Sequence, residues 1–393
     1  MVYIVVKQPP MYHQMTLEEL FMVSDDEYKE VCIRSDATCT KTYRREQVSD
    51  LMKSKFGKNT DCLIESLALF NDKYSDLMSA DRHSLYRSFK IPKKSGGFRQ
   101  IDAPEDELMS ALTELKGLFE RLFVVRGGAL YHTSAFAYIK GRNTIDCVKR
   151  HQSNESKWFC KLDLSNFFGS TTIEFVEKMF SLVYPFSEVI ADERGREEFR
   201  KAIGLAFLDG GLPQGTPISP LITNIMMIPI DFELANGLRN FEKNTFVYTR
   251  YADDFIISSK FDFDFKKVEA YLIDTFNKYG APFTLNTKKT RYGSSSGSNW
   301  NLGVMLNKDN EITVGYKTKK RFKAALASYV MDRNNGTPWS LGDLQTLNGN
   351  YSYYRSVEKE NIDTLVYNVN KKFGVDVISM MREDIRNACT CNV

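Results

Sequence analysis

Histidine is scarce in this chain, and its cysteines are not paired. The four histidines lack the spacing of a metal site, and the seven cysteines include no Cys-x-x-Cys pair. We therefore expect neither a zinc site nor a disulfide framework, and reduced thiols favour a cytoplasmic location. A Ser–His–Asp hydrolase pattern has no support either.

Long apolar runs and phosphate-binding glycine loops are also missing. No hydrophobic stretch approaches the roughly 18 residues that a membrane span needs, and the first residues lack the charged start and apolar core of a signal peptide. The Gly-x-x-x-x-Gly-Lys sequence of a P-loop does not occur. We expect no membrane partner, and we expect any nucleotide to be held by something other than a P-loop.

The overall composition is that of a globular protein with several subdomains. The 393 residues are 42% hydrophobic and 26% charged, and the formal net charge is only +3. So small a charge says little about nucleic acid, because the distribution of basic residues matters more than their total. One basic cluster surrounds Gly96-Gly97, which is typical of a β-hairpin turn. A second opens a predicted helix that ends near Met331: Lys317, Lys319, Lys320, Arg321 and Lys323.

Two adjacent carboxylates form the most informative feature. Asp253 and Asp254 lie at the tip of a predicted β-hairpin, between segments rich in aromatic and β-branched residues. Neighbouring like charges are costly unless a cation neutralises them, and paired carboxylates suit Mg²⁺. A third carboxylate, Asp163, ends a short apolar segment far upstream. Three carboxylates match a two-metal phosphoryl-transfer site, whose ions lie about 3.5–4 Å apart. Ordinary polar turn chemistry is the alternative for the hairpin pair.

Three motifs together resemble those of a reverse transcriptase. Asp163 with Phe167-Phe168, the segment Gly211–Pro220, and Tyr251-Ala252-Asp253-Asp254 occur in that family's order. Further segments resemble its fingers and the strands around its palm: 90–101 with Ala103-Pro104, 135–138 with 141–143, 285–290 and 301–307. The resemblance covers residues 85 to 355, approximately, so several independent motifs carry it.

The resemblance implies an α+β right-hand polymerase with fingers, palm and thumb. The expected divisions are a helical N-terminal extension (1–80), fingers (81–157), a palm with the catalytic hairpin (158–312), and a helical thumb and tail (313–393). Hydrophobic patterning predicts helices over 15–21, 45–56 and 63–78 in the extension, and over 105–125 in the fingers.

The same resemblance assigns roles at the site of synthesis. Asp163, Asp253 and Asp254 are expected to be catalytic and to hold two Mg²⁺ ions, with Mn²⁺ as a substitute. Phe168 resembles an aromatic gate that selects deoxynucleotides, and Lys289 resembles a residue that steadies the triphosphate or protonates pyrophosphate. The other expected nucleotide-binding residues are Lys93, Lys94, Arg99, Gln214 and Gly215.

Contacts with nucleic acid are expected on both sides of the palm. Tyr251 is expected to pack beneath the primer end and Arg142 to approach a phosphate. The thumb residues expected to follow the phosphate backbone are Lys317, Lys319, Lys320, Arg321 and Lys323. The implied partners are dNTPs, a DNA product and an RNA template, for which a cognate structured noncoding RNA is a candidate. A protein partner or homo-oligomer is left open.

Within the family, the chain is most similar to bacterial retron and defence-associated enzymes. Its segment 147–151 keeps only the histidine of one retron signature, and 301–303 keeps only the glycine of another. These departures favour a defence-associated enzyme outside the retrons. Untemplated or protein-primed DNA synthesis by the same site, or a retron or group II-like retroelement enzyme, remain as alternatives. An RNA polymerase is disfavoured by Phe168, and a non-catalytic scaffold by the three carboxylates.

Overall fold

The computed structural model describes residues 2–8, 11–15, 31–35, 38–43, 60–92, 96–122, 131–239, 241, 245–295 and 302–390. For the first four ranges it describes the backbone alone. Lys93 and Lys94 lie outside the described residues, as do the helices predicted over 15–21 and 45–56 apart from Met15, which ends a strand.

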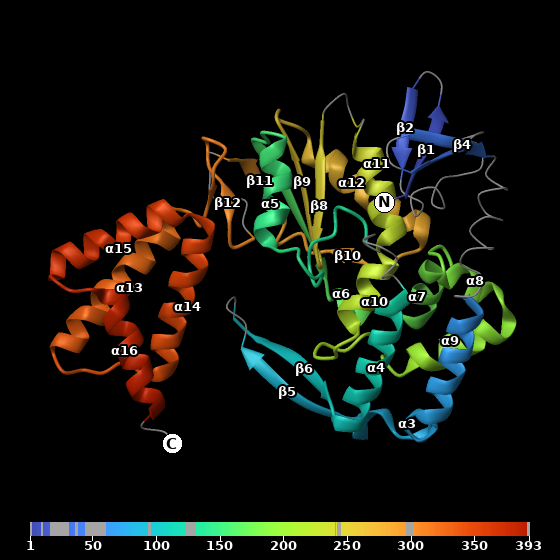
Figure 1. Cartoon of the computed structure of the whole chain (residues 1–393), viewed down its shortest axis with the longest axis horizontal. Helices are drawn as coiled ribbons and strands as arrows, with labels where there is room; N and C mark the ends of the chain where they lie inside the picture. Colours follow the sequence, from blue (N-terminus) through green and yellow to red (C-terminus); the bar gives the residue numbers. More distant parts are fainter. Residues whose placement is uncertain are drawn as a thin grey trace.

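The N-terminal extension begins with a sheet, which corrects the expectation of a wholly helical segment. Its strands are β1 (Val2–Gln8), β2 (Met11–Met15), β3 (Val31–Ser35) and β4 (Thr38–Tyr43). They pair antiparallel in the order β2-β1-β3-β4 (Figure 1). Alternating β-branched residues such as Val2, Ile4 and Val6 explain the strands, because such side chains favour extended backbone. Among the described residues of the extension, helix covers residues 60–73 and α3 (Ser75–Ser79).

The fingers are built on a two-stranded ribbon. A 3-10 turn (Arg82–Leu85) leads into β5 (Tyr86–Pro92), which pairs antiparallel with β6 (Phe98–Pro104). Gly96 and Gly97, just before β6, both have positive φ, 89° and 75°, a conformation that glycine adopts without steric cost. The ribbon projects below the palm in Figure 1. The helices of this part are α4 (Asp106–Leu122) and α5 (Thr144–Ser153).

The palm is an antiparallel sheet with helices packed on it. Its strands are β7 (Trp158–Ser165), β8 (Val247–Tyr251), β9 (Asp254–Ser259), β10 (Thr284–Leu285) and β11 (Arg291–Ser294). Their order is β10-β7-β9-β8, and β11 also pairs with β7. The helices are α6 (Phe167–Ser170), α7 (Ile173–Phe180), α8 (Phe186–Ala191), α9 (Glu193–Gly204), α10 (Ser219–Met226), α11 (Ile228–Arg239) and α12 (Phe265–Tyr279).

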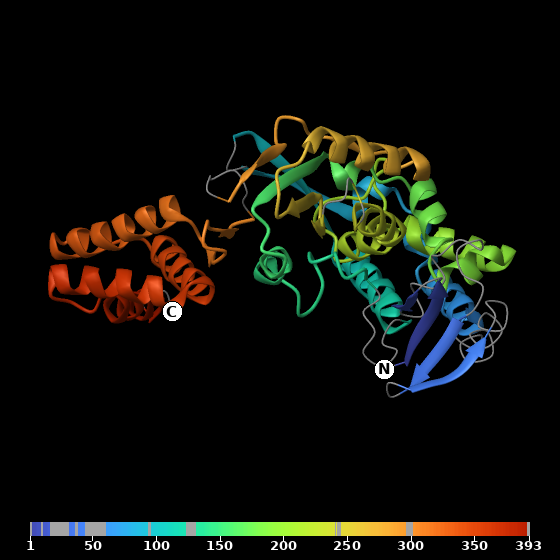
Figure 2. The same ribbon diagram turned by 90° about the horizontal axis from the view of Figure 1, so that it is seen from above.

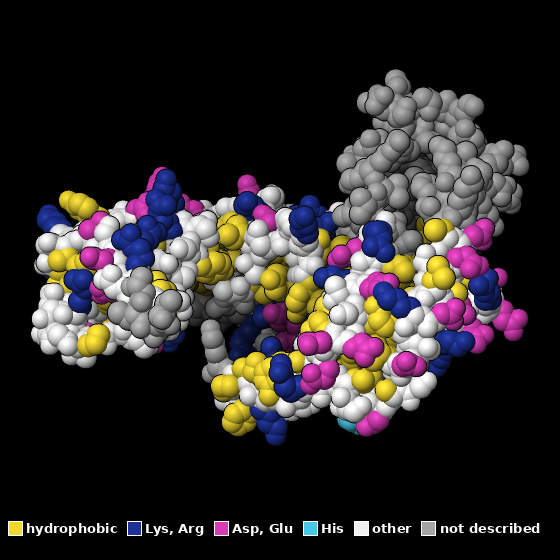
Figure 3. All heavy atoms as spheres, turned by 60° about the horizontal axis from the view of Figure 1, so that its bottom comes forward, with side chains coloured by type: hydrophobic (Ala, Val, Ile, Leu, Met, Phe, Trp, Pro, Cys, Tyr) yellow, Lys and Arg dark blue, Asp and Glu magenta, His cyan; other side chains and the backbone are white. Residues whose placement is uncertain are grey.

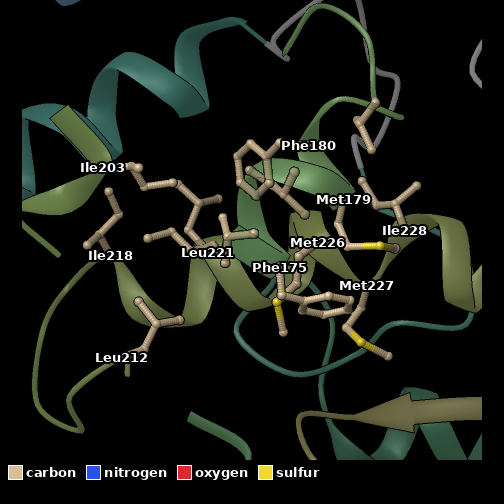
Figure 4. Close-up of a cluster of buried hydrophobic side chains, with 14 of the residues drawn as sticks. Phe175, Met179, Phe180, Ile203, Leu212, Ile218, Leu221, Met226, Met227 and Ile228 are labelled. Carbon is tan, nitrogen blue, oxygen red and sulfur yellow. The ribbon is translucent and has the colours of Figure 1, made fainter. Parts of the chain in front are cut away.

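A continuous hydrophobic core joins these helices to the sheet and to the fingers. Figure 4 shows α7 side chains meeting residues of α9, α10 and the loop before α10, among them Phe175, Phe180, Ile203, Leu212 and Leu221. Aromatic packing continues between Phe180 and Phe186, whose ring centroids lie 4.6 Å apart. Burial of this apolar surface fixes the loop that precedes α10 in the core.

The thumb is a separate helical bundle with its own core. It contains α13 (Tyr316–Asn334), α14 (Leu341–Val357), α15 (Lys359–Phe373) and α16 (Val377–Thr390). The short strands β12 (Met305–Leu306) and β13 (Ile312–Thr313) pair antiparallel and join it to the palm. Figure 2 shows the bundle extending to one side. In the described part of the chain, no helix combines the length and the apolarity that crossing a membrane demands.

Candidate active site

Strand register brings the three carboxylates to one end of the palm sheet. Asp163 of β7 lies directly opposite Asp254 of β9, and β8 and β9 form the predicted hairpin. The backbone N–H of Leu164 donates to the carbonyl oxygen of Asp253 at 3.1 Å. Ala252, in the turn, has φ 57°, a left-handed conformation that is uncommon for a residue with a side chain. The adjacency of Asp163 to the hairpin, expected from the motifs, is thus a consequence of sheet pairing.

Two lysines neutralise two of the carboxylates. The Lys289 ammonium lies 3.0 Å from Asp163 Oδ1, and the Lys161 ammonium lies 2.8 Å from Asp254 Oδ2. The Lys161 side chain is 19% exposed, whereas that of Lys289 is 59% exposed. Lys161 was missed by the sequence analysis, although its position two residues before Asp163 places it on the same face of β7. Lys289 was expected at the site, and it reaches the first carboxylate.

Burial and mutual repulsion raise the pKa of both hairpin carboxyls. Burial is the main cause for Asp253, whose pKa is raised further by the nearby charge of Asp163. Burial also raises the pKa of Asp254 to about 6, although Lys161 opposes the rise. Each carboxylate therefore gains from a nearby cation.

The donor atoms suit a hard divalent cation. Asp163 Oδ1 and Asp254 Oδ1 are buried and accept no hydrogen bond from any residue that the structure describes, although the Lys289 ammonium lies near the former. Carboxylate oxygens with free lone pairs are the ligands that Mg²⁺ prefers. Within the described ranges, however, no group of three His, Cys, Asp or Glu side chains is arranged to hold a metal ion. Lys289 and Lys161 pair with Asp163 and Asp254 instead. The side chains of these pairs would therefore have to move before a metal ion could bind the carboxylates.

The two phenylalanines after Asp163 have different environments. Phe167 is buried in the core, whereas Phe168 is only half-buried and faces Tyr138 edge-on, with ring centroids 6.5 Å apart. Tyr138 is itself 60% exposed. Of the two rings, Phe168 is therefore the one that is partly exposed, and its role as a gate remains a prediction.

A close backbone crossing joins this segment to the Pro-Gln-Gly loop. The Leu212 N–H donates to the Phe168 carbonyl at 3.0 Å. A Cβ on Gly211 would lie 2.3 Å from the carbonyl oxygen of Gly169, so only glycine fits there. In the same loop, the Gln214 carbonyl accepts from Asp102 N–H at 2.8 Å.

The Gly215 backbone packs closely against strand β6 of the fingers. Its φ is +127°, and an added Cβ would lie 2.9 Å from the Asp102 carbonyl oxygen of β6. The expected close backbone approach is present, but its observed partner is protein. The nucleotide contacts of Gln214 and Gly215 remain predictions.

Of the three basic fingers residues expected to bind nucleotide, Arg99 is the one that lies among the described residues. It is exposed on β6, opposite Ile91. Burial is the main cause that raises the pKa of the Tyr138 hydroxyl, Asp253 raises it further, and Arg99 opposes the rise. Tyr138 thus lies within electrostatic reach of both the fingers ribbon and the catalytic hairpin.

Arg142 and Tyr251 are integrated into the palm. Arg142 Nη1 donates to the carbonyl oxygens of His132 and Ala135 at 2.8 and 2.6 Å, so it holds the loop before α5. Its contact with a phosphate remains a prediction. Tyr251 is half-buried and packs on a cluster that includes Val304 and Leu306. Its expected place beneath a primer end is untested.

One of the basic residues at the start of the thumb has a carboxylate partner. Lys319 donates to the buried Glu358 at 2.9 Å, and Glu358 also accepts from the Val314 N–H at 3.0 Å. Lys319 therefore ties the start of α13 to the start of α15 within the thumb, and its contact with a phosphate remains a prediction. The remaining members are exposed: Lys317, Lys320, Arg321 and Lys323. Figure 3 shows a hollow between thumb, palm and fingers with basic and acidic side chains inside it.

Comparison with known proteins identifies the family. The model described as reverse transcriptase (RNA-dependent DNA polymerase) matches residues 91–321, more than half of the chain. The chain belongs to the reverse transcriptase family. Members of this family are RNA-directed DNA polymerases, and the palm, fingers and thumb above are their right-hand fold.

Similar curated proteins include bacterial retron enzymes. The chain is 28% identical to the retron Ec83 reverse transcriptase of Escherichia coli over 311 residues, which is 76% of this chain and 90% of that protein. It is 32% identical to the retron Mx162 reverse transcriptase of Myxococcus xanthus over 188 residues, 45% of this chain and 36% of that protein. These matches confirm the retron-like resemblance. The preference for a defence enzyme outside the retrons remains a prediction.

Among solved structures, telomerase from Candida tropicalis is similar. Its apo form matches with a TM-score of 0.44 at 14% identity, covering 77% of this chain and 62% of the telomerase chain. The present chain therefore spans less than two thirds of that protein's length.

Proposed function

We propose that this protein extends a primer 3′ hydroxyl with dNTPs on an RNA template by two-metal phosphoryl transfer. The observation that carries the proposal is the register that places Asp163 beside the Asp253-Asp254 hairpin, in a chain of the reverse transcriptase family. Asp163, Asp253 and Asp254 would hold the divalent ions. Such ions activate the attacking hydroxyl and stabilise charge on the leaving oxygen.

The two lysines have different parts in this proposal because their exposure differs. Lys161, largely covered, keeps Asp254 charged and oriented while no other cation is near it. Lys289, mostly exposed, can release Asp163 and swing toward the triphosphate, where an ammonium can stabilise or protonate the departing pyrophosphate. Charge at the site then remains balanced as substrate enters.

Phe168 and Tyr138 would select the sugar. An aromatic ring against the 2′ carbon of the incoming nucleotide leaves no room for a 2′ hydroxyl. The half-buried position of Phe168 and its edge-on contact with Tyr138 support this role, because the neighbour restricts the ring's movement. Arg99, with Lys93 and Lys94, would bind the triphosphate; an arginine offers a planar fork for phosphate oxygens.

The thumb would hold the template–primer duplex. Lys317, Lys320, Arg321 and Lys323 are exposed on the first turns of α13, and lysine and arginine that neutralise phosphates give salt-dependent binding. We further propose a structured noncoding RNA as template and a role in bacterial anti-phage defence; the likeness to retron reverse transcriptases supports both.

Asp253→Asn tests the catalytic assignment. Metal-ion catalysis contributes several kcal/mol, so loss of this ligand should lower single-nucleotide addition by about 1,000-fold, since each 1.36 kcal/mol is tenfold. Folding and template–primer binding should persist. Asp274→Asn, an exposed carboxylate on α12, is the matched control and should retain full activity. Full activity of Asp253→Asn would refute the assignment.

The template is tested by sequencing the nucleic acid that copurifies with the chain, before and after addition of dNTPs and Mg²⁺. One dominant RNA that is copied into complementary DNA supports a dedicated template. DNA without a complementary RNA, or DNA joined to a tyrosine, would contradict it.

A further inference from the structure

A fully buried ion pair lies beneath the catalytic hairpin. Arg250, three residues before Asp253, is 1% exposed, and its partner Asp231 of α11 is 0% exposed. Arg250 Nη2 donates to Asp231 Oδ2 at 2.8 Å, and Nε donates to Oδ1 at 2.9 Å. Tyr248 Oη also donates to Asp231 Oδ1, at 2.6 Å. The carboxylate therefore holds the guanidinium in one orientation.

The remaining nitrogen of the guanidinium is directed at the catalytic turn. Arg250 Nη1 donates to the Ala252 carbonyl at 3.3 Å and to Asn224 Oδ1 at 3.1 Å. The Ala252 carbonyl belongs to the peptide that carries the N–H of Asp253, and Ala252 is the residue with left-handed backbone. Such a conformation persists only when its surroundings over-determine it. Arg250 supplies one of the constraints that do so.

The same network reaches two other parts of the site. Asn224, on α10 just after the Pro-Gln-Gly loop, donates its Nδ2 to the Ala137 carbonyl at 2.9 Å, next to Tyr138. The Arg250 backbone N–H donates to the Ser134 carbonyl oxygen at 2.7 Å. The Arg250 carbonyl oxygen accepts from the Phe136 N–H at 2.9 Å. The catalytic turn, α10 and the segment 134–137 thus all contact Arg250, the first two through its side chain and the third through its backbone.

Stability alone does not account for such an arrangement. The cost of removing two charges from water can exceed their attraction, so an apolar pair of similar volume often stabilises a fold equally well. A guanidinium that binds a carboxylate through two nitrogens instead fixes the orientation of the arginine side chain, because its planar fork allows one geometry.

We propose that Arg250, oriented by Asp231, is a positioning residue that sets the Ala252–Asp253 peptide and thereby the Asp253 carboxylate. The inference rests on the proposed role of Asp253 in nucleotide addition. Arg250 itself touches no substrate: it acts through the turn. Removing it should change the rate of the chemical step more than the binding of either substrate.

The decisive variant removes the charges while keeping the volume. Arg250→Met, Asp231→Leu and Tyr248→Phe together delete both charges and the hydroxyl that would lose its partner. We expect this triple variant to unfold at the wild-type temperature. Its kcat for single-nucleotide addition should fall about 100-fold, the effect of a 1 Å misplacement. The dNTP KM and the template–primer Kd should stay within about threefold, since neither site is altered.

Arg250→Lys is the second variant, used because it keeps the buried charge if the triple variant fails to fold. An ammonium cannot bind Asp231 in bidentate fashion and reach Ala252 together, so kcat should again fall with KM little changed. Arg333→Lys, which alters a thumb guanidinium bound to Asp384 at 2.8 and 2.9 Å, is the matched control and should have wild-type kcat.

The outcomes distinguish failure of the positioning role from failure of the proposed function. Wild-type kcat in the triple variant or in Arg250→Lys would overturn the positioning role. So would a loss of kcat that matches the loss of folded protein, because that indicates a purely structural contribution. An inactive wild-type chain would contradict the proposed function itself, whatever the variants do.

Discussion

Gly211→Ala should damage synthesis through a backbone clash remote from the carboxylates. The new Cβ would lie 2.3 Å from the Gly169 carbonyl oxygen, 2.8 Å from its carbonyl carbon and 2.9 Å from its Cα. All three atoms are backbone, so no side chain can rotate away. Relief therefore requires the two segments to separate by about 1 Å, given contact distances near 3.5 Å.

That separation would act on both the fold and the site. Overpacking of this kind costs typically about 1–3 kcal/mol of unfolding free energy. The crossing also carries the hydrogen bond from Leu212 to Phe168, so Phe168, the proposed aromatic gate, would move relative to the Pro-Gln-Gly loop. A displacement near 1 Å can cost about 100-fold in rate. We expect kcat to fall by about that factor, with a smaller loss of stability.

The assay compares single-nucleotide addition with thermal unfolding for Gly211→Ala and a control. Gly117→Ala is the control, because an added Cβ in α4 would meet only the end of Arg121 at 3.7 Å. Alanine in a helix interior should stabilise by about 0.5–1 kcal/mol. Wild-type rate and stability in Gly211→Ala would refute the claim that this crossing is tight.

The remaining predictions concern the gate and the pH dependence. Phe168→Ala should admit ribonucleotides, measured as the ratio of kcat/KM for dNTP and rNTP. Phe167→Ala should mainly lower stability, because that ring is buried. Unchanged sugar selection in Phe168→Ala would refute the gate. Because the pKa of Asp254 is raised to about 6, lowering the pH through 6 should protonate it and weaken metal binding, so activity at limiting Mg²⁺ should fall with the pH. Higher Mg²⁺ should shift this acidic limb to lower pH, since metal competes with protons; a limb that ignores Mg²⁺ would contradict the reasoning.

Local sequence signals predicted the central palm strands, the hairpin and the candidate catalytic carboxylates. The Ala252–Asp253 turn between β-rich segments, and an apolar strand ending near Asp163, could be predicted because strand propensity and turn chemistry depend on neighbours in the chain. The motifs then indicated a polymerase palm, and the family match confirmed it. The same reasoning missed the strands of the N-terminal extension, where alternation over five to seven residues was overlooked.

Only the tertiary structure decided what these residues contact. Lys161 neutralises Asp254, Lys319 pairs with Glu358, and Arg250 is buried against Asp231, and all three pairings join segments that are separated in the chain. A charged residue looks the same in sequence whether it is solvated or paired, because its partner is chosen by packing. The sequence alone therefore indicated which chemistry to expect, and the fold decided which side chains contact and orient the residues of the site.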